Sequence, residues 1–368
     1  MRPGGIRTAL SCGALALVAA CAPAPPVENA PRALRGEEQA LLAHVEVLAS
    51  DAFAGREVGT IGEGLTLDYM QRELAAAGLQ SGTHDPGNPW REPVRYDRGQ
   101  RTIDTYNLIG RLPGTEPQAG AVLLVAHWDH LGFGVRCRPK GADRICNGAV
   151  DNATGLAMMI EISRRLVDGP RPRRDVYFLA TGGEEDGLRG ALAFVQDPPV
   201  PLGKFVAVFN LDTEGVAPAG APAVVLGTPT PPGIAGLTAL IERTARDEGV
   251  RIVPPDSGNL RLLKRQDGWV FDAVGVPAVI VSAAFAQQTR FTDFMRTRYH
   301  RANDEISGVE LGGTADMVRL HVELLRRAAD PAQFAGRVTG AASPAWNAAK
   351  APGVAIVPAV AENSEIAP

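Results

Sequence analysis

Histidine and carboxylate side chains follow three apolar runs of this 368-residue sequence. HWDH (127–130) comes directly after AVLLVA, Glu184 and Glu185 come shortly after DVYFLA, and Asp212 follows FVAVF. If these runs are parallel strands of one sheet, their carboxyl ends lie at the same edge, where open α/β sheets bind ligands. We therefore expect these side chains to gather at one site. Imidazole and carboxylate groups are the ligands that zinc-like divalent ions accept.

Two further segments contribute candidates for the same site. Asp151 and Asn152 lie in GAVDNATG (148–155) before an amphipathic segment, and either residue would also serve as the N-cap of a helix there. His300 follows Tyr299 in a polar segment after the last apolar run, although a single histidine is more often an ordinary surface or core residue. The remaining histidines fit that ordinary interpretation: His44, His84 and His321.

Taken together, two histidines and three carboxylates suit a pair of zinc-like ions with one carboxylate between them. Calcium and magnesium sites rarely use two histidines. The adjacent side chains of Glu184 and Glu185 point in different directions, so that one would bind metal while the other takes a proton from water. For Glu184 the rival interpretation is a cap of a helix that begins near Gly187.

Alternating apolar and amphipathic segments between residues 36 and 330 predict the elements that position these groups. Strands are expected at 121–126, 175–180, 205–209, 223–226 and 277–281, and several are continuous apolar runs that suit burial on both faces. Helical patterns cover 38–48, 65–79, 152–166, 188–195, 233–248 and 314–328. This alternation predicts an α/β fold, a three-layer sandwich with a mostly parallel central sheet and helices on both faces. We expect a single catalytic domain over 36–330.

The composition excludes several classes of protein. The chain has 37 basic and 41 acidic residues, a net charge of −4, and 21% charged and 45% hydrophobic residues. These values are close to those of soluble globular proteins, and they exclude a disordered chain, a fibrous repeat and a protein with many membrane spans. The near-neutral balance, without a basic stripe, argues against a nucleic-acid partner. No protein partner can be inferred from the sequence.

Residues 1–35 predict export. Arg2 and Arg7 precede a short apolar stretch that ends in VAAC at Cys21. This ending resembles the lipobox of bacterial lipoproteins, in which the cysteine is lipidated; the alternative is an ordinary cleavable signal peptide. The resemblance implies a signal peptide over 1–20, a lipid anchor at Cys21, an Ala/Pro-rich tether over 21–35 and a periplasm-facing membrane lipoprotein of the cell envelope. At the other end, 331–368 is expected to be a poorly ordered Ala/Pro-rich tail.

Cys137 and Cys146 lie in a polar loop, RCRPKGADRIC. An oxidising compartment would favour a disulfide between them. The alternative is a metal-binding pair, which is weaker because CxxC spacing is absent and Cys12 and Cys21 belong to the export segment.

Five motifs, in order along the chain, resemble those of metallopeptidase family twenty-eight, the di-zinc exopeptidases that include bacterial aminopeptidases and relatives of glutamate carboxypeptidase. The motifs are HWDHLG (127–132), NGAVDNATG (147–155), GGEEDGLRGA (182–191), FNLDTEG (209–215) and YHRANDE (299–305). LASDAFAGREVGT (48–60) also looks like the segment that opens the domain in this family. The resemblance implies a zinc-exopeptidase-like fold, two Zn²⁺ per chain and peptide substrates.

The resemblance also implies five metal ligands. His127, Asp151 and Asp212 would hold one zinc ion. Asp151, Glu185 and His300 would hold the other, so that Asp151 bridges the two ions.

Four further residues receive roles from the same resemblance. Glu184 would take a proton from the water between the metals and pass it to the leaving amine. Asp129 would hydrogen-bond His127 and fix its tautomer. Tyr299 would donate to the developing oxyanion, and His130 would have a supporting or structural role.

The resemblance therefore implies an exported zinc-dependent aminopeptidase that releases N-terminal residues by a two-metal mechanism with a bridging water. The alternatives are a carboxypeptidase-type exopeptidase, a glutaminyl cyclase with the same fold and one zinc, and an inactive peptide-binding lipoprotein. The complete ligand set argues against the last two. Where many members of the family have Ser-Asp-His before the last core strand, this chain has Gln266-Asp267-Gly268, which changes the wall of the pocket.

Overall fold

A computed structural model describes residue 1, residues 34–227 and residues 233–336. The predicted signal peptide and Cys21 lie outside the described residues, as does most of the predicted tether and tail. Residues 331–336 fall within the predicted tail, but Phe334 is buried and the Arg174 guanidinium donates to its carbonyl oxygen (2.6 Å). None of the helices in the described part of the chain has the length and apolar character to cross a membrane.

One mixed sheet of nine strands lies at the centre of the fold, as far as the chain is described. Its strands are β1 (Gln80–Ser81), β2 (Arg91–Arg98), β3 (Arg101–Leu112), β4 (Ala121–His127), β5 (Asp175–Thr181), β6 (Phe205–Asn210), β7 (Ala223–Leu226), β8 (Ile252–Val253) and β9 (Ala278–Ser282). Their order is β1-β3-β5-β4-β6-β9-β7-β8, and β2 pairs with β3. The central strands β5, β4, β6 and β9 are parallel, whereas β3 and β7 join them antiparallel.

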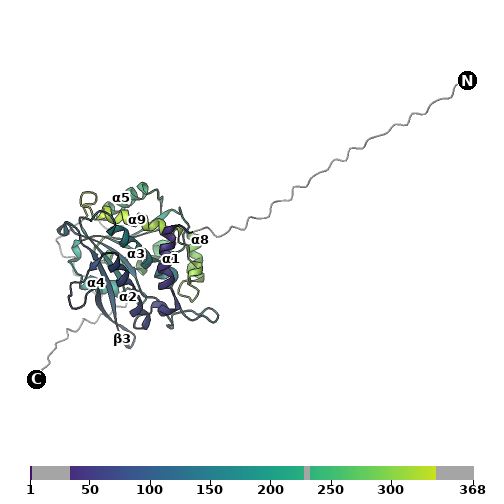
Figure 1. Ribbon diagram of the computed structural model, residues 1–368, viewed down its shortest axis with the longest axis horizontal. Helices are drawn as coiled ribbons and strands as arrows, with labels where there is room; N and C mark the ends of the chain where they lie inside the picture. The colour runs from purple at the N-terminus through teal and green to yellow at the C-terminus, as the bar shows by residue number, and fades with distance from the viewer. Residues whose placement is uncertain (2–33, 228–232, 337–368) are drawn as a thin grey trace. The chain divides into compact units, whose positions relative to one another are not determined.

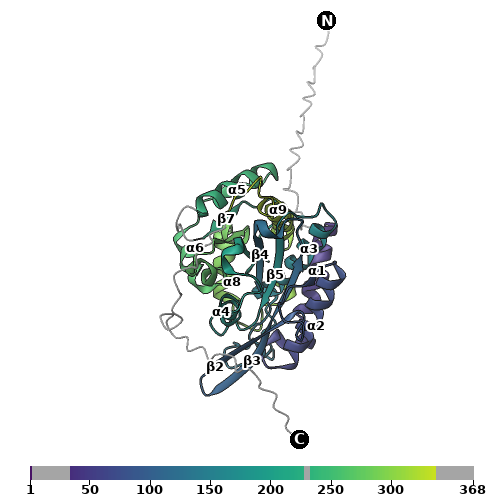
Figure 2. The same ribbon diagram turned by 90° about the vertical axis from the view of Figure 1, so that its left-hand side faces the viewer.

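Helices cover both faces of this sheet (Figures 1 and 2). They are α1 (Gly36–Leu48), α2 (Ile61–Ala76), α3 (Thr154–Val167), α4 (Arg189–Gln196), α5 (Gly233–Asp247), α6 (Ser257–Leu262), α7 (Gly268–Ala273), α8 (Gln288–Thr297) and α9 (Gly312–Ala328). Val122 and Leu124 of β4 face a core shared with α1, α2, α3, α5 and α9, while Leu123 and Val125 face a second core shared with α4 and α7. The predicted three-layer α/β sandwich with a mostly parallel sheet is confirmed.

The buried central strands bring the predicted motifs to one edge of the sheet. Every residue of β4, β5 and β6 is buried, which explains their continuous apolar sequence. In the register of the sheet, His127 at the end of β4 pairs with Thr181 at the end of β5, and Asn210 at the end of β6 pairs with Val125. The three segments that follow these strands therefore start side by side.

The β2–β3 hairpin is the main element that the sequence did not predict. In β2 only Val94 and Tyr96 are buried, whereas β3 is buried on both sides at Leu108 and Ile109. It adds an antiparallel edge to the parallel sheet, and it contacts two of the motifs: the Gly182 amide donates to the Asn107 side chain (3.1 Å), and the Trp128 indole donates to the Tyr106 carbonyl oxygen (2.8 Å). Cys137 and Cys146 form the predicted disulfide, with Cα atoms 5.6 Å apart.

Candidate metal centre

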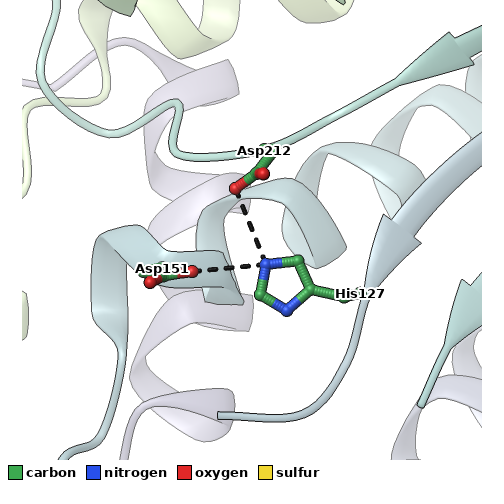
Figure 3. A group of neighbouring side chains, drawn as sticks. All are labelled: His127, Asp151 and Asp212. Carbon is green, nitrogen blue, oxygen red and sulfur yellow. Dashed lines mark ion pairs between the residues drawn. The ribbon is translucent and has the colours of Figure 1, made fainter. Parts of the chain in front are cut away.

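His127, Asp151 and Asp212 form the first candidate metal cluster (Figure 3). His127 is the last residue of β4, Asp212 follows β6, and Asp151 lies in the turn before α3. The Nε2 atom of His127 lies 3.2 Å from Oδ1 of Asp151 and 3.6 Å from Oδ1 of Asp212. The structure thus brings together the three residues that we predicted as ligands of one metal.

The turn that carries Asp151 is held by its neighbours. Residues 149–153 form one π-type turn, and the Asp304 carboxylate accepts a hydrogen bond from the Asp151 amide (3.1 Å). The side-chain oxygen of Asn152 accepts from the Gly155 amide in the first turn of α3 (3.2 Å). The N-cap residue of α3 is Ala153, so neither of the two expected residues occupies that position. Asn152 binds an amide of the first turn, and the Asp151 carboxylate faces the histidines.

The second candidate cluster surrounds Glu185. Oε2 of Glu185 lies 3.1 Å from Nε2 of His300, and its Oε1 lies 2.8 Å from Nδ1 of His130. Oδ2 of Asp151 lies 3.5 Å from Nε2 of His300 and 3.7 Å from Nδ1 of His130. One oxygen of Asp151 thus faces each cluster, which is the arrangement that a bridging carboxylate requires. His130, to which we gave a supporting role, lies as close to Glu185 and Asp151 as a ligand would.

Buried polar atoms without a hydrogen-bond partner converge on the second cluster. They are Nδ1 and Nε2 of His130, Oδ2 of Asp151, Oε1 of Glu185 and Nε2 of His300. Buried polar atoms are normally hydrogen-bonded, so a group of orphaned imidazole and carboxylate atoms indicates a ligand that completes them. Nitrogen and carboxylate oxygen donors in this number fit zinc. The residues present therefore fit zinc ions at both clusters.

Asp129 contacts His127 through its backbone and Glu184 and Glu185 through its side chain. We expected Asp129 to hydrogen-bond His127, and Nδ1 of His127 faces the backbone carbonyl oxygen of Asp129 at 3.0 Å. That carbonyl fixes the tautomer of the ring. The buried Asp129 carboxylate instead accepts hydrogen bonds from the backbone amides of Glu184 (3.0 Å) and Glu185 (3.3 Å). A buried carboxylate needs donors, and the turn that follows β5 supplies them.

The two adjacent glutamates have opposite electrostatic surroundings. Burial raises the pKa of Glu184 well above its usual value, and the charge of Glu185 adds to this effect although His127 opposes it. Burial also acts on Glu185, but its contacts with His130 and His300 bring its pKa down to about 2. Separated pKa values of this kind are typical of carboxyl pairs in which one group transfers a proton and the other stays charged. The start of α4 has no side-chain cap, so Glu184 does not act as one.

A pocket opens beside the first cluster. Its floor contains His127, Asp151, Glu184 and Asp212. Much of its wall is formed by seven apolar side chains: Leu226, Leu262, Leu263, Ile280, Phe285, Phe291 and Met295. The pocket therefore combines an acidic floor with a wall that suits an apolar group.

Polar residues also line the pocket, among them Tyr299 and Gln266. The Tyr299 ring stacks on His300 with centroids 3.7 Å apart, and its hydroxyl accepts from the exposed Arg265 guanidinium (3.3 Å). Gln266, in the segment that departs from the family pattern, accepts from the Asn210 side-chain amide (2.7 Å). The changed segment is thus tied to the end of β6 and still contributes to the pocket.

Arg56 and Asp304 also support the site, although the sequence analysis did not identify either residue. Both are completely buried, and both bind the backbone of the Asp151 turn. Each lies in a segment that resembles the family, 48–60 for Arg56 and 299–305 for Asp304. Their positions in these motifs could have indicated a role in the site. The residue types alone, however, did not indicate which contacts they make.

The fold and the site define a zinc-exopeptidase-like α/β protein. Residues 107–325 match the model of Peptidase family M28, and the chain belongs to this family. Among curated relatives, a vacuolar membrane protease of Candida dubliniensis is 26% identical over 244 residues, which cover 63% of this chain and 23% of the relative. The alkaline phosphatase isozyme conversion protein of Escherichia coli is 29% identical over 147 residues, 38% of this chain and 40% of that protein. The chain thus spans less than half the length of either relative.

Solved structures share the fold at low sequence identity. A glutaminyl cyclase of Porphyromonas gingivalis has a TM-score of 0.60 at 17% identity, over 78% of this chain and 97% of that one. A Zn-dependent exopeptidase of Parabacteroides distasonis has a TM-score of 0.56 at 16% identity, over 78% and 97% of the two chains. An aminopeptidase of Aneurinibacillus sp. strain AM-1 has a TM-score of 0.56 at 13% identity, over 79% and 93%. Proteins with this fold therefore include a glutaminyl cyclase as well as exopeptidases.

Proposed function

We propose that the chain is a zinc-dependent aminopeptidase that prefers an apolar N-terminal residue. The observation that carries this proposal is the pocket beside the first cluster, with its acidic floor and apolar wall. A substrate α-ammonium group would pair with carboxylates of the floor, and the first side chain would leave water for the wall. Membership of a peptidase family supports the reaction class.

In the proposed hydrolysis, different residues of the chain would have different roles. Zinc at the two clusters would supply Lewis-acid chemistry, lowering the pKa of a water and polarising the scissile carbonyl. Glu184, whose pKa is raised by burial, would accept the proton of the attacking water and return it to the leaving amine. Asp129 holds the backbone of Glu184 in place, and the Tyr299 hydroxyl would donate to the developing oxyanion.

Fluorogenic aminoacyl substrates test the proposed preference on the zinc-loaded protein. Leucyl and phenylalanyl substrates should be cleaved at least about 10-fold more efficiently than aspartyl or lysyl ones, because a charged side chain would lose its hydration against the apolar wall. N-blocked dipeptides should be poor substrates, because they lack the ammonium group. Faster cleavage of blocked dipeptides would favour a carboxypeptidase instead, and a preference for aspartyl substrates would assign substrate binding to Arg265.

A pair of variants on one helix sharpens this test. Met295 of α8 lines the pocket, whereas Thr292 of the same helix is exposed and does not. Met295→Glu should lower kcat/KM for the leucyl substrate about 10-fold or more through its KM, since it places a charge in the wall. Thr292→Glu adds the same charge to the same helix and should leave kcat/KM unchanged. Equal effects of the two variants would show that the pocket does not hold the first side chain.

A glutaminyl cyclase is the second candidate, because a cyclase is among the structures with the same fold. The two activities differ in product: the cyclase closes an N-terminal glutamine on itself without consuming water. A cyclisation assay on a glutaminyl peptide, run beside zinc analysis of the same preparation, separates them. Cyclised product with one zinc per chain would favour the cyclase, and hydrolysis with two zinc ions favours the aminopeptidase.

We also propose that the chain is exported and anchored to a membrane of the cell envelope through Cys21, which lies outside the described residues. The lipobox-like sequence and the Cys137–Cys146 disulfide support export. Cys21→Ser should move the protein from the membrane fraction to the soluble fraction after cell lysis. If the variant sediments with membranes like the wild type, another part of the chain anchors it.

A further inference from the structure

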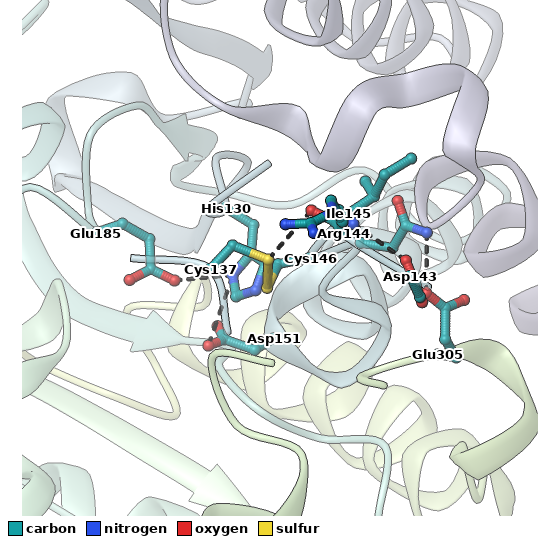
Figure 4. Close-up of a disulfide and its surroundings, with 10 residues drawn as sticks. His130, Cys137, Asp143, Arg144, Ile145, Cys146, Asp151, Glu185 and Glu305 are labelled. Carbon is teal, nitrogen blue, oxygen red and sulfur yellow. Dashed lines mark hydrogen bonds and ion pairs between the residues drawn. A yellow bond between two sulfur atoms is a disulfide. The ribbon is translucent and has the colours of Figure 1, made fainter. Parts of the chain in front are cut away.

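The loop from Gly132 to Cys146 (the disulfide loop) lies between the two segments that carry His130 and Asp151 (Figure 4). Its base is closed twice. The Cys137–Cys146 disulfide makes one closure, and the Cys146 amide donates to the Gly132 carbonyl oxygen (2.9 Å) to make the other. The disulfide is buried in a small cluster with Leu131 and Ala302. A loop closed in this way keeps a fixed shape, and the proposed hydrolysis assigns it no role.

The disulfide loop binds the segment that carries Glu185. The Arg136 guanidinium donates to the backbone carbonyl oxygen of Glu185 and to the carboxylate of Asp186, the latter at 2.9 Å. Asp186 also accepts from Arg98 (2.8 Å), which ties the same turn to β2. The backbone of Glu185 is therefore held from the side of the disulfide loop as well as by Asp129.

The same loop binds the segment that carries His300. The Arg138 amide donates to the His300 carbonyl oxygen (3.3 Å), and the Ala302 amide donates to the Arg138 carbonyl oxygen (3.0 Å). His300 has φ +58°, in the left-handed region that residues other than glycine avoid. Such a backbone conformation persists where its surroundings hold it. One of these two hydrogen bonds is made by the carbonyl group of His300 itself, and Ala302 packs against the disulfide.

The first cluster is held differently. His127 is fixed by the Asp129 carbonyl oxygen and Asp212 accepts from the Thr213 hydroxyl (2.7 Å). Among the contacts of the described residues, none joins these two ligands to residues 132–146. The loop thus contacts the segments of Glu185 and His300, which face the second cluster and not the first.

We infer that the disulfide loop positions Glu185 and His300, so that the zinc affinity of the second cluster, and not that of the first, depends on the Cys137–Cys146 bond and on Arg136. This inference rests on the two-metal site of the proposed function. It can be tested without an activity assay, because the affinity of each cluster for the metal alone can be measured. Residues that orient metal ligands typically contribute 10- to 100-fold to metal affinity, and we expect an effect of about that size.

Titration of the metal-free protein with Co²⁺ and Zn²⁺ tests the inference. Co²⁺ absorption reports the ligand geometry of each equivalent, and His300→Ala identifies the equivalent that belongs to the second cluster. In Arg136→Ala and in Cys137→Ala/Cys146→Ala that equivalent should bind about 10- to 100-fold more weakly with an altered spectrum. The other equivalent should keep its affinity and spectrum. Arg144→Ala, which removes an exposed arginine of the same loop, should change neither.

The other possible results of these titrations also bear on the inference. Unchanged binding of both equivalents in Arg136→Ala and the cysteine variant would overturn the inference, and so would equal weakening of both equivalents. If the cysteine variant fails to fold, Arg136→Ala decides, because that side chain is 40% exposed and its loss leaves the disulfide intact. A wild-type protein that binds two metal ions but cleaves no peptide would contradict the proposed function and leave this inference standing.

Discussion

Glu184→Gln should lower turnover about 10²–10⁴-fold while the zinc content stays that of the wild type, because general acid–base assistance is usually of this size. Glutamine keeps the size and hydrogen-bonding capacity of the side chain but cannot accept a proton. Glu184 belongs to neither candidate metal cluster, although it lies in the floor of the pocket. The substitution therefore removes the proton acceptor and leaves the imidazole and carboxylate ligands in place.

Asp151→Asn is the matched comparison for this result. Its carboxylate faces both clusters, so that weakening it should lower the zinc content together with the rate. Turnover and zinc stoichiometry are measured on the same preparations of both variants. A Glu184→Gln protein with near-normal turnover would remove Glu184 from the mechanism. A Glu184→Gln protein without zinc would show that the roles of Glu184 and Glu185 are reversed.

The parts of the fold and site that could be predicted are those encoded locally. β4, β5 and β6 are buried on both faces, so that each is a continuous apolar run in the sequence. Because parallel strands end at one edge, the position of His127, Glu185 and Asp212 after these runs was enough to place them together. Strand β2 lacked such a signal, since only Val94 and Tyr96 of it are buried.

The supporting contacts could not be predicted because they depend on the path of the chain between distant segments. His130 stands in a motif that we used, but its distance to Glu185 depends on the turn after β4. For Asp129 the residue was identified and the interacting atoms were not, since carbonyl and carboxylate are indistinguishable in a sequence pattern. Asp304 contacts Asp151 across 153 residues of sequence. Hydrophobic periodicity contains no information about contacts of this kind.

Arg56→Met should lower the free energy of unfolding by at least about 3 kcal/mol, because it removes the donor from several buried carbonyl oxygens that each cost about 1–3 kcal/mol when unpaired. Nε of Arg56 donates to the Trp128 carbonyl oxygen (3.0 Å), and the two terminal nitrogens donate to those of Leu48 (2.8 Å), Asn147 (2.6 Å) and Gly148 (3.0 Å). This one side chain therefore joins the end of α1, the segment after β4 and the turn before α3.

The Arg56 guanidinium stays charged in this buried position. Burial lowers its pKa to about 10, while the negative charges of Asp151 and Asp304 oppose that effect. A pKa of about 10 leaves the cation intact near neutral pH. Arg56→Lys keeps the charge, but a single ammonium group lacks the planar set of donors that reaches several carbonyl oxygens at once. We expect the lysine variant to recover only part of the lost stability.

Urea unfolding of the metal-free proteins measures these effects without a contribution from zinc binding. Arg95→Met is the matched control, since Arg95 is an exposed arginine of β2 whose ion pair with Asp104 is also exposed; it should change the free energy of unfolding by about 0.5 kcal/mol or less. The zinc-loaded Arg56 variants should also contain less metal, because the Asn147 and Gly148 carbonyl oxygens precede the turn that carries Asp151. An Arg56→Met protein with the urea midpoint and zinc content of the wild type would show that the Asp304 contact suffices to hold this turn.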